Sequence, residues 1–183
     1  MNGKGTLIAM DDKEWKLKAL KERAKRAGAF NIETRHIDNL KVIKRLNQSA
    51  DFVLLDVPCS GLGVLKRNFD TKWQDRTIEI QELINIQADI LDKYSQMTVK
   101  NGTLVYSTCS ILPSENQNQI AKFLEKHKDF ILEEDRTVLP SEGGDGFYMA
   151  RLKRLDTTSE ENSQNEVNLE KAEQPEVLQE NQD

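Results

Sequence analysis

The sequence is poor in cysteine, proline and aromatic residues, and it contains no long apolar run. Its 183 residues include two cysteines, four prolines and 6% aromatic residues, whereas 31% of the residues are charged. Two cysteines cannot form the disulfide framework of a small secreted protein, which predicts a reducing compartment such as the cytoplasm. No stretch approaches the roughly 20 apolar residues that a membrane-spanning helix needs. These absences predict a soluble, cytoplasmic protein that does not act in a membrane.

The 26 basic residues are outnumbered by 31 acidic ones, but the resulting net charge of −5 is unevenly distributed. Residues 155–183 contain nine acidic residues and one lysine, a charge of −8, so residues 1–154 carry +3. A charge of +3 is compatible with a polyanionic substrate but excludes the strongly basic footprint of a general nucleic-acid binder. Residues 155–183 are polar and contain no aromatic side chain, which predicts an acidic disordered tail. Residues 1–154 are long enough for a single domain.

Short apolar runs alternate with amphipathic stretches along residues 5–154. Such alternation is typical of an α/β fold, in which helices cover both faces of a mostly parallel sheet. The last two apolar runs are expected to pair antiparallel at one edge of that sheet. The predicted strands are 5–10, 32–37, 51–55, 103–106, 130–132 and 146–152, and the predicted helices are 13–27, 40–46, 78–97 and 113–126.

Both cysteines follow predicted strands and lie among turn and hydroxyl residues. Cys59 belongs to residues 56–63 (Asp-Val-Pro-Cys-Ser-Gly-Leu-Gly), and Cys109 belongs to residues 107–110 (Ser-Thr-Cys-Ser). Ligands of open α/β sheets bind beyond the carboxyl ends of the strands, so the two thiols are expected to face one crevice. The alternative is that they are small buried apolar residues. Their position outside the apolar runs favours a chemical role.

Other thiol chemistry is a weaker interpretation of the same residues. Neither cysteine forms a C-x-x-C pair, and no histidine lies near either one in the sequence, which disfavours a redox protein or a thiol hydrolase. A histidine that approaches only in the folded protein would keep the hydrolase open. His36 and His127 have no partners at catalytic or metal-ligand spacing. We therefore expect both histidines to be structural and predict no metal site.

Asp11, Asp38 and Asp56 come at or just after the ends of three predicted strands. A carboxylate at such an end can accept hydrogen bonds from ribose hydroxyls, and one at the next strand can bind an adenine amino group. The series therefore indicates a nucleoside cofactor. The alternative is that each aspartate forms a turn or caps a helix, because aspartate favours both places.

Four segments carry a family resemblance: 56–63, 67–73, 106–110 with Glu115-Asn116, and 145–150. Together they resemble the S-adenosylmethionine-dependent RNA cytosine-5 methyltransferases of the Sun/Nop type. Among these, the bacterial small-subunit ribosomal RNA methyltransferase B type is most similar. The resemblance extends in collinear order from about Gly5 to Arg154. It implies a Rossmann-like class I methyltransferase sheet, S-adenosyl-L-methionine as cofactor and RNA, in particular ribosomal RNA, as partner.

The resemblance also implies roles for individual residues. Cys109 would add as a thiolate to C6 of cytosine, and Cys59 would assist the release of the methylated RNA. Asp56 would contact the cytosine and the cofactor, Asp11 the cofactor ribose and Asp38 the adenine. DNA cytosine-5 methyltransferases instead use the cysteine of a Pro-Cys motif, which would make Cys59 the nucleophile. The Ser-Thr-Cys-Ser motif favours Cys109.

Four residues beside the first cysteine are candidates for RNA contact: Pro58, Arg67, Lys72 and Trp73. Arg67 and Lys72 would hold a phosphate, and Trp73 would stack or wedge beside a base that has left the helical stack. The alternative is a surface loop in which Trp73 packs as a satellite of the core.

The sequence departs from the family pattern at its start. In the family, a first strand and a Gly-rich loop precede the strand that ends at Asp11, and an RNA-binding region precedes both. The family sheet order, 3-2-1-4-5-7-6, places that first strand between the strands of Asp11 and Asp56. We therefore expect an interrupted sheet and a partial catalytic domain at residues 1–154 that is weak or inactive alone. The alternatives are a non-catalytic RNA-binding remnant and one half of a split methyltransferase whose N-terminal half is encoded separately. An amino-methyltransferase is disfavoured, because it would have Asn or Asp followed by Pro-Pro and an aromatic residue at position 56.

Overall fold

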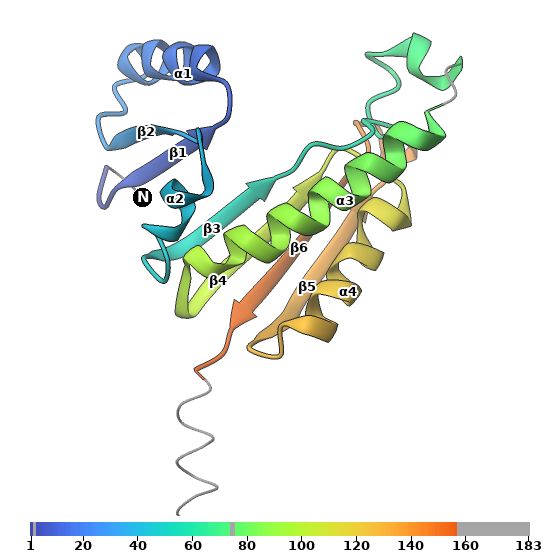
Figure 1. Ribbon diagram of the computed structural model, residues 1–183. Helices are drawn as coiled ribbons and strands as arrows, with labels where there is room; N and C mark the ends of the chain where they lie inside the picture. The colour runs from blue at the N-terminus through green and yellow to red at the C-terminus, as the bar shows by residue number, and fades with distance from the viewer. Residues whose placement is uncertain (2, 74–75, 157–183) are drawn as a thin grey trace, which may run out of the picture.

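Strands and helices alternate from Leu7 to Arg154 in the computed structural model of the protein (Figure 1). The structure describes residues 1, 3–73 and 76–156, so most of the predicted tail lies outside the described residues. The elements are β1 (Leu7–Asp11), α1 (Glu14–Arg26), β2 (Ile32–His36), α2 (Leu40–Lys44), β3 (Ala50–Asp56), α3 (Thr77–Tyr94), β4 (Thr98–Thr108), α4 (Gln117–Lys126), β5 (Phe130–Val138) and β6 (Phe147–Arg154), with short 3-10 helices at Phe69–Trp73, Ser95–Met97, Pro113–Glu115 and Pro140–Glu142.

The strands form two separate sheets. Strands β1 and β2 pair in parallel, and the other four strands form a sheet in the order β3-β4-β6-β5. Within it, β3 and β4 are parallel, whereas β6 runs antiparallel to both β4 and β5. The predicted α/β class is confirmed, and so is the antiparallel pair at the sheet edge. The interruption falls between the strand of Asp11 and the strand of Asp56, as the resemblance predicts.

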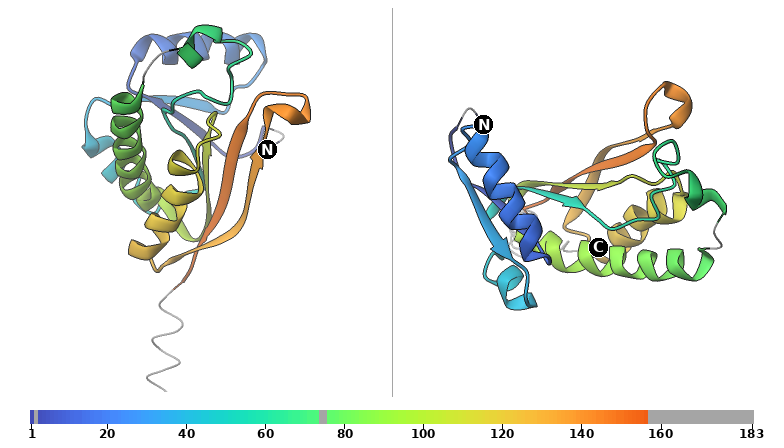
Figure 2. Two further views of the ribbon diagram at one scale, coloured as in Figure 1. Left: turned by 90° about the vertical axis from the view of Figure 1, so that its right-hand side faces the viewer. Right: turned by 90° about the horizontal axis from the view of Figure 1, so that it is seen from above.

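Helices α3 and α4 cover the same face of the four-stranded sheet, and α1 lies over β1 and β2 (Figure 2). Residues of β3 show the effect of this one-sided cover, because alternate side chains of a strand point to opposite faces. Val53 and Leu55 are buried in the core, whereas Phe52 is 79% and Leu54 is 69% exposed. The open face of β3 therefore carries large apolar side chains at the protein surface.

The core lies between α3, α4 and the buried face of the four-stranded sheet. Its most enclosed apolar side chains are Leu91 of α3, Ile120 of α4, Leu104 and Tyr106 of β4, and Leu152 of β6. Full burial of a leucine or isoleucine side chain contributes about 1.5–3 kcal/mol. This packing fixes β4, and with it the strand end that precedes Cys109.

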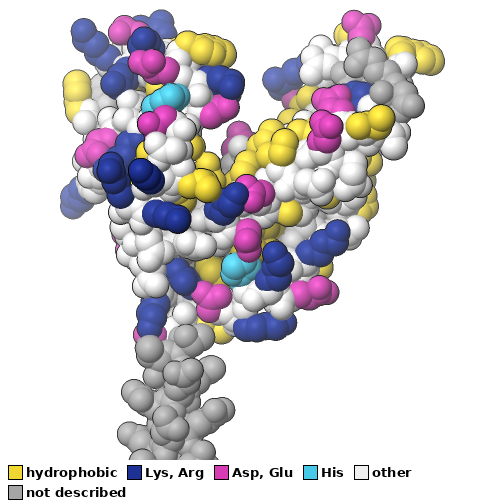
Figure 3. All heavy atoms as spheres, viewed as in Figure 1, with side chains coloured by type: hydrophobic (Ala, Val, Ile, Leu, Met, Phe, Trp, Pro, Cys, Tyr) yellow, Lys and Arg dark blue, Asp and Glu magenta, His cyan; other side chains and the backbone are white. Residues whose placement is uncertain are grey.

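A notch divides the surface of the molecule. Figure 3 shows it between the part that contains α1 and the part that contains α3, with hydrophobic side chains exposed within it.

Among the described residues, no helix has the length and apolar composition that crossing a membrane requires. Over the same residues, no group of three or more His, Cys, Asp and Glu side chains is arranged to hold a metal ion.

Candidate active site

The two cysteines lie next to each other at the carboxyl ends of β3 and β4. Their sulfur atoms are 3.2 Å apart, and both side chains are half-buried. Parallel pairing explains the approach, because Asp56 at the end of β3 is in register with Ser107 near the end of β4. The chain then needs three residues to reach Cys59 and two to reach Cys109. The predicted proximity of the thiols is confirmed, while the roles of the two thiols stay predictions.

Backbone hydrogen bonds hold the Cys59 loop, residues 57–63, against the end of β4. The Val57 N–H donates to the Ser107 carbonyl over 3.2 Å, and the Gly63 N–H donates to the Cys109 carbonyl over 3.0 Å. The Gly146 N–H in turn donates to the Gly63 carbonyl over 2.7 Å. The Cys59 loop is thereby fixed at both ends, and the segment before β6 closes over it.

The environment of Cys59 favours the protonated thiol. Burial raises the pKa of Cys59 to about 12, and the hydrogen bond with Cys109 adds to the shift. A group with this pKa keeps its proton at neutral pH. The Cys59 thiol can therefore donate a hydrogen bond to the sulfur of Cys109, its neighbour in the site.

A buried polar cluster that sequence reasoning missed lies beside the two cysteine loops. Its centre is Glu115, a side chain that is fully buried and bonded to Ser60, Ser110 and Gln87. The sequence placed Glu115 only within a family motif, without a role. Gln87 offered a clearer signal, since it occupies a position on the apolar stripe of α3 where the periodicity calls for a hydrophobic residue. It is fully buried in the structure.

Of the three predicted aspartates, the structure brings one to the cysteines. Asp56 ends β3, is exposed and shares the open face with Phe52 and Leu54. Asp11 ends β1, and Asp38 lies two residues beyond β2, so both lie at the other sheet. Within the described part of the chain, no hydrogen bond or ion pair links these two aspartates to the cysteine loops.

Asp11 and Asp38 differ in how they are engaged. One carboxylate oxygen of Asp11 accepts from the Lys13 N–H over 2.8 Å, and the other pairs with the Lys16 ammonium group at 3.1 Å. Asp11 therefore stabilises the turn that precedes α1, in line with the turn alternative. Asp38 is exposed and lines an open polar hollow together with His36 and Arg45.

The RNA-contact candidates lie in the segment between β3 and α3. Pro58 is exposed, and its carbonyl accepts from the Gln87 side chain over 2.9 Å. Arg67 is 77% exposed and pairs with Asp145 at 2.6 Å. Trp73 is 81% exposed, so it does not pack as a satellite of the core. The side chain of Lys72 lies outside the described residues.

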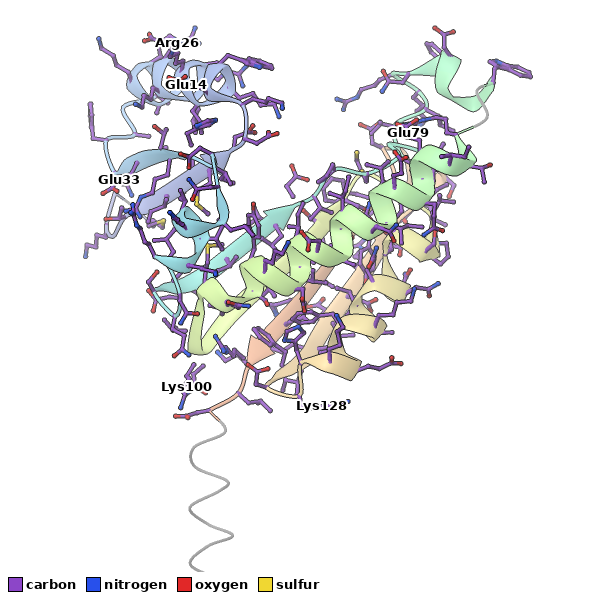
Figure 4. The ribbon with its side chains drawn as sticks, viewed as in Figure 1. Glu14, Arg26, Glu33, Glu79, Lys100 and Lys128 are labelled. Carbon is purple, nitrogen blue, oxygen red and sulfur yellow. The ribbon has the colours of Figure 1, made fainter. Side chains whose placement is uncertain are left out.

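Arg76 joins this region to the start of α3. Its guanidinium donates to the Ser60 carbonyl over 2.5 Å and forms an ion pair with Glu79, which Figure 4 labels at the first turns of the helix. The hydrogen bond with Glu79 raises the pKa of Arg76 further, with smaller contributions from Glu115 and Cys59. A permanent positive charge therefore lies close to the cysteine loops.

Comparison with known proteins assigns the chain to a family. A family profile described as 16S rRNA methyltransferase RsmB/F matches residues 1–153. Ribosomal RNA small subunit methyltransferase B of Photorhabdus laumondii is 40% identical over 160 residues, which cover 81% of this chain and 36% of that protein. The chain thus spans about a third of the length of this curated relative.

Solved structures agree with that assignment. The crystal structure of PH0851 superposes with a TM-score of 0.79 at 30% identity, over 84% of this chain and 38% of that one. The crystal structure of NSun6 from Pyrococcus horikoshii with SFG gives a TM-score of 0.72 at 28% identity, over 84% and 42% of the two chains. The fold is that of the Rossmann-like methyltransferases, and the chain belongs to the 16S rRNA methyltransferase RsmB/F family.

Proposed function

We propose that this chain supplies the thiol half of an S-adenosylmethionine-dependent enzyme that methylates C5 of cytosine in ribosomal RNA. One observation carries the proposal: two half-buried thiols lie 3.2 Å apart at the carboxyl ends of parallel strands. Membership of a ribosomal RNA methyltransferase family supports RNA as the substrate. The thiol pair supports chemistry on a pyrimidine ring, since such a ring accepts a thiolate at C6.

Cys109 is the nucleophile in this mechanism. Its sulfur bonds to C6 of cytosine, and the electron pair of the C5–C6 double bond moves toward C5. S-adenosylmethionine, when bound, supplies an electrophilic methyl group for that electron-rich carbon. Loss of the C5 proton then restores the double bond and expels the Cys109 thiolate. A thiolate suits both steps, because it is strongly nucleophilic and also leaves readily.

Cys59 acts at the release step. The raised pKa of Cys59 means that it holds a proton at neutral pH beside the sulfur of Cys109. That proton stabilises the departing Cys109 thiolate by a hydrogen bond, so the release of methylated RNA becomes easier. The same property argues against Cys59 as the attacking group, because the thiol form is a poor nucleophile.

The carboxylates of the three aspartates are suited to bind a nucleoside cofactor. Asp38 is exposed just beyond the end of β2, where a carboxylate can accept from an adenine amino group. Asp11 would exchange its contact with the exposed Lys16 ammonium group for a ribose hydroxyl. Asp56, exposed at the end of β3 beside the thiols, would orient the cytosine between cofactor and nucleophile.

In this proposal, RNA contacts the protein through Arg67, Lys72 and Trp73. Exposed Trp73 offers a flat surface on which a base can stack, a contact that contributes about 1–3 kcal/mol per base in single-stranded RNA recognition. Arg67 and Lys72 would pair with phosphates on either side of the extruded cytosine. Pro58 would line the path of that base toward Cys109.

The test is the release of tritium from small-subunit ribosomal RNA that contains cytidine labelled at C5. Tritium release that depends on S-adenosylmethionine reports substitution at C5, so the assay distinguishes C5 methylation from methylation elsewhere. We expect Cys109→Ala to abolish tritium release and Cys59→Ala to leave a covalent RNA adduct that persists. An adduct that persists with Cys109→Ala and disappears with Cys59→Ala would reverse the two roles. Cofactor-dependent methylation without tritium release would refute C5 chemistry.

A second candidate is a non-catalytic RNA-binding remnant of such a methyltransferase. One observation favours it: β1 and β3 belong to separate sheets, and the open face of β3 exposes Phe52 and Leu54. In that case the isolated chain binds ribosomal RNA but not S-adenosylmethionine. Micromolar binding of S-adenosylmethionine to the chain alone, measured by calorimetric titration, would contradict this second candidate.

A further inference from the structure

Glu115 is a fully buried acid whose side chain contacts both cysteine loops. One carboxylate oxygen accepts from the Ser60 N–H over 2.8 Å and from the Gln87 side-chain amide over 3.0 Å. The other accepts from the Ser60 hydroxyl over 2.5 Å and from the Ser110 hydroxyl. Four donors thus surround a group that has no access to solvent.

The residues held by Glu115 are the immediate neighbours of the cysteines. Ser60 follows Cys59 and Ser110 follows Cys109, and these serines come from loops that leave two different strands. The serine hydroxyls also lie 3.2 Å from each other. The Glu115 carboxylate therefore joins the two loops directly beside Cys59 and Cys109.

The position of Glu115 is itself fixed from three directions. The Tyr106 hydroxyl of β4 donates to the Glu115 carbonyl over 2.7 Å, which anchors the 3-10 helix to the sheet. Gln87 of α3 donates to the Glu115 carboxylate and accepts from Gln119 of α4 over 3.1 Å. Because these contacts come from a strand and two helices, the carboxylate is a rigid reference point for both loops.

Simple packing does not explain a carboxylate at this place. Burial of an acid is costly unless hydrogen bonds and charge compensate it, so an apolar residue would be the simpler filler. Here four donors contact the acid, and the Arg76 guanidinium bonds to the Ser60 carbonyl beside it. A carboxylate can join two loops, because each of its oxygens can accept more than one hydrogen bond.

We propose that Glu115 is a positioning residue that sets the separation between the Cys59 and Cys109 sulfur atoms. Its importance for catalysis rests on the proposed function, in which both thiols act on one cytosine. Glu115 touches neither the cysteine sulfurs nor any group to which we assign a contact with substrate. It acts through Ser60 and Ser110.

The test measures sulfur proximity without RNA or cofactor, so it is independent of the proposed function. Diamide oxidises two neighbouring thiols to a disulfide and takes up their two hydrogens, and mass spectrometry of the full chain follows the loss of both thiols. We expect Glu115→Asp, which keeps the charge but is one methylene shorter, to slow disulfide formation about tenfold, the effect of losing about one hydrogen bond. Glu115→Gln should retain nearly the wild-type rate, because its oxygen can accept from the two N–H donors while the serine hydroxyls turn to accept from its amide.

Ser95→Ala is the matched control. Ser95 is buried and its hydroxyl donates to the Asp92 carbonyl over 3.1 Å, outside the hydrogen-bond network of Glu115. This variant should lower the thermal midpoint while the rate of disulfide formation stays at the wild-type value. An equal slowing in Ser95→Ala and Glu115→Asp at matched stability would show that Glu115 is only structural and would overturn the proposal.

Ser110→Ala keeps the proposal testable if Glu115→Asp does not fold. It removes the contact of Glu115 with the Cys109 loop, together with the bonds of the Ser110 hydroxyl to the Ser60 hydroxyl and the Leu112 N–H. It should slow disulfide formation by a smaller factor. Wild-type rates in this variant would also overturn the proposal. In an assembly competent for methyl transfer, Glu115→Asp should lower kcat and leave KM for RNA unchanged. If the variants lose methyl transfer but keep wild-type diamide kinetics, the positioning role of Glu115 is wrong and the proposed function stands. If the wild type shows no C5 methylation, the proposed function is wrong and the positioning role stands.

Discussion

Gly63 and Gly146 pack backbone to backbone at the edge of the candidate active site. The Gly146 N–H donates to the Gly63 carbonyl over 2.7 Å. A Cβ atom on Gly63 would lie 2.7 Å from the Gly146 carbonyl carbon and 2.8 Å from the Cys109 carbonyl oxygen. These are backbone atoms, which cannot rotate away as a side chain can. The close approach explains why the Cys59 loop ends in glycine.

Gly63→Ala should therefore destabilise the protein and separate the two cysteine loops. We expect the free energy of unfolding to fall by about 1–3 kcal/mol, the usual cost of forcing extra atoms into a packed place. Urea unfolding followed by circular dichroism measures the change. Gly144→Ala is the control, since a Cβ there meets nothing within 4 Å. Equal stability of the two variants would contradict the packing argument.

Stability should fall as the pH rises above about 9. Burial raises the pKa of the Cys59 thiol and of the Tyr106 and Tyr148 hydroxyls above their ordinary values of 9.0, 10.0 and 10.0. Below pH 9 these groups are protonated in both the folded and the unfolded state, so their contribution to the free energy of unfolding is fully present. Above it the unfolded state loses protons that the folded state keeps, which favours unfolding. Urea midpoints between pH 8 and pH 11 measure the slope.

Tyr148→Phe is the matched variant for this pH dependence. It removes one phenol, whose hydroxyl donates to Asp135 over 2.9 Å, and keeps the ring that packs edge-on near Tyr106. The variant should be less stable at pH 8, but its stability should fall less steeply with rising pH. The same slope in wild type and variant would show that Tyr148 does not contribute.

Apolar periodicity predicted every strand and α-helix of the body, but it predicted their lengths less well and missed the 3-10 helices at Phe69–Trp73 and Pro140–Glu142. β4 extends from Thr98 to Thr108, whereas the apolar run begins only at Thr103. The segment Lys100-Asn101-Gly102 has the composition of a turn, and Asn101 adopts a positive φ of 58°. The structure accommodates this segment as an irregularity in the pairing of β3 with β4. Such a local distortion leaves no apolar pattern to detect.

The sequence also predicted the meeting of Cys59 and Cys109, because strand ends of a parallel sheet converge. It could not predict what holds them. Glu115 lies only five residues from Ser110, but its distance from Ser60 in the sequence gives no sign of their contact. Contacts between distant loops follow from packing of α3 and α4 on the sheet, which no local pattern encodes. Gln87 on an apolar helix face was the one detectable trace.

Arg67 should contribute to RNA affinity but little to stability. Its side chain is 77% exposed in the ion pair with Asp145, and ion pairs at the surface contribute about 0–1 kcal/mol. Arg67→Gln should weaken binding to ribosomal RNA across sequences and reduce the salt dependence of the binding constant by about one phosphate contact. Fluorescence anisotropy at several salt concentrations measures both effects.

Lys128→Gln removes the same charge at the other end of the molecule and serves as the control for Arg67→Gln. Lys128 lies beyond the end of α4, far from Glu79 at the start of α3 (Figure 4). Its replacement should leave RNA affinity unchanged. If both variants weaken binding alike, RNA contact is a diffuse charge effect, and the loop that contains Arg67 is not the contact surface.

The reactivity of Cys59 should depend on its neighbour. Burial is the main cause of its raised pKa, and the hydrogen bond with Cys109 is the second. Cys109→Ala removes the second cause and keeps the first, so the pKa of Cys59 should fall but stay above the ordinary value of 9.0. Because the thiolate is the reactive form, iodoacetamide should modify Cys59 faster in Cys109→Ala than in wild type at pH 9. The same chain unfolded in urea should react faster still. Mass spectrometry of the peptide that contains Cys59 gives all three rates. An unchanged rate in Cys109→Ala would mean that the hydrogen bond with Cys109 does not raise the pKa of Cys59.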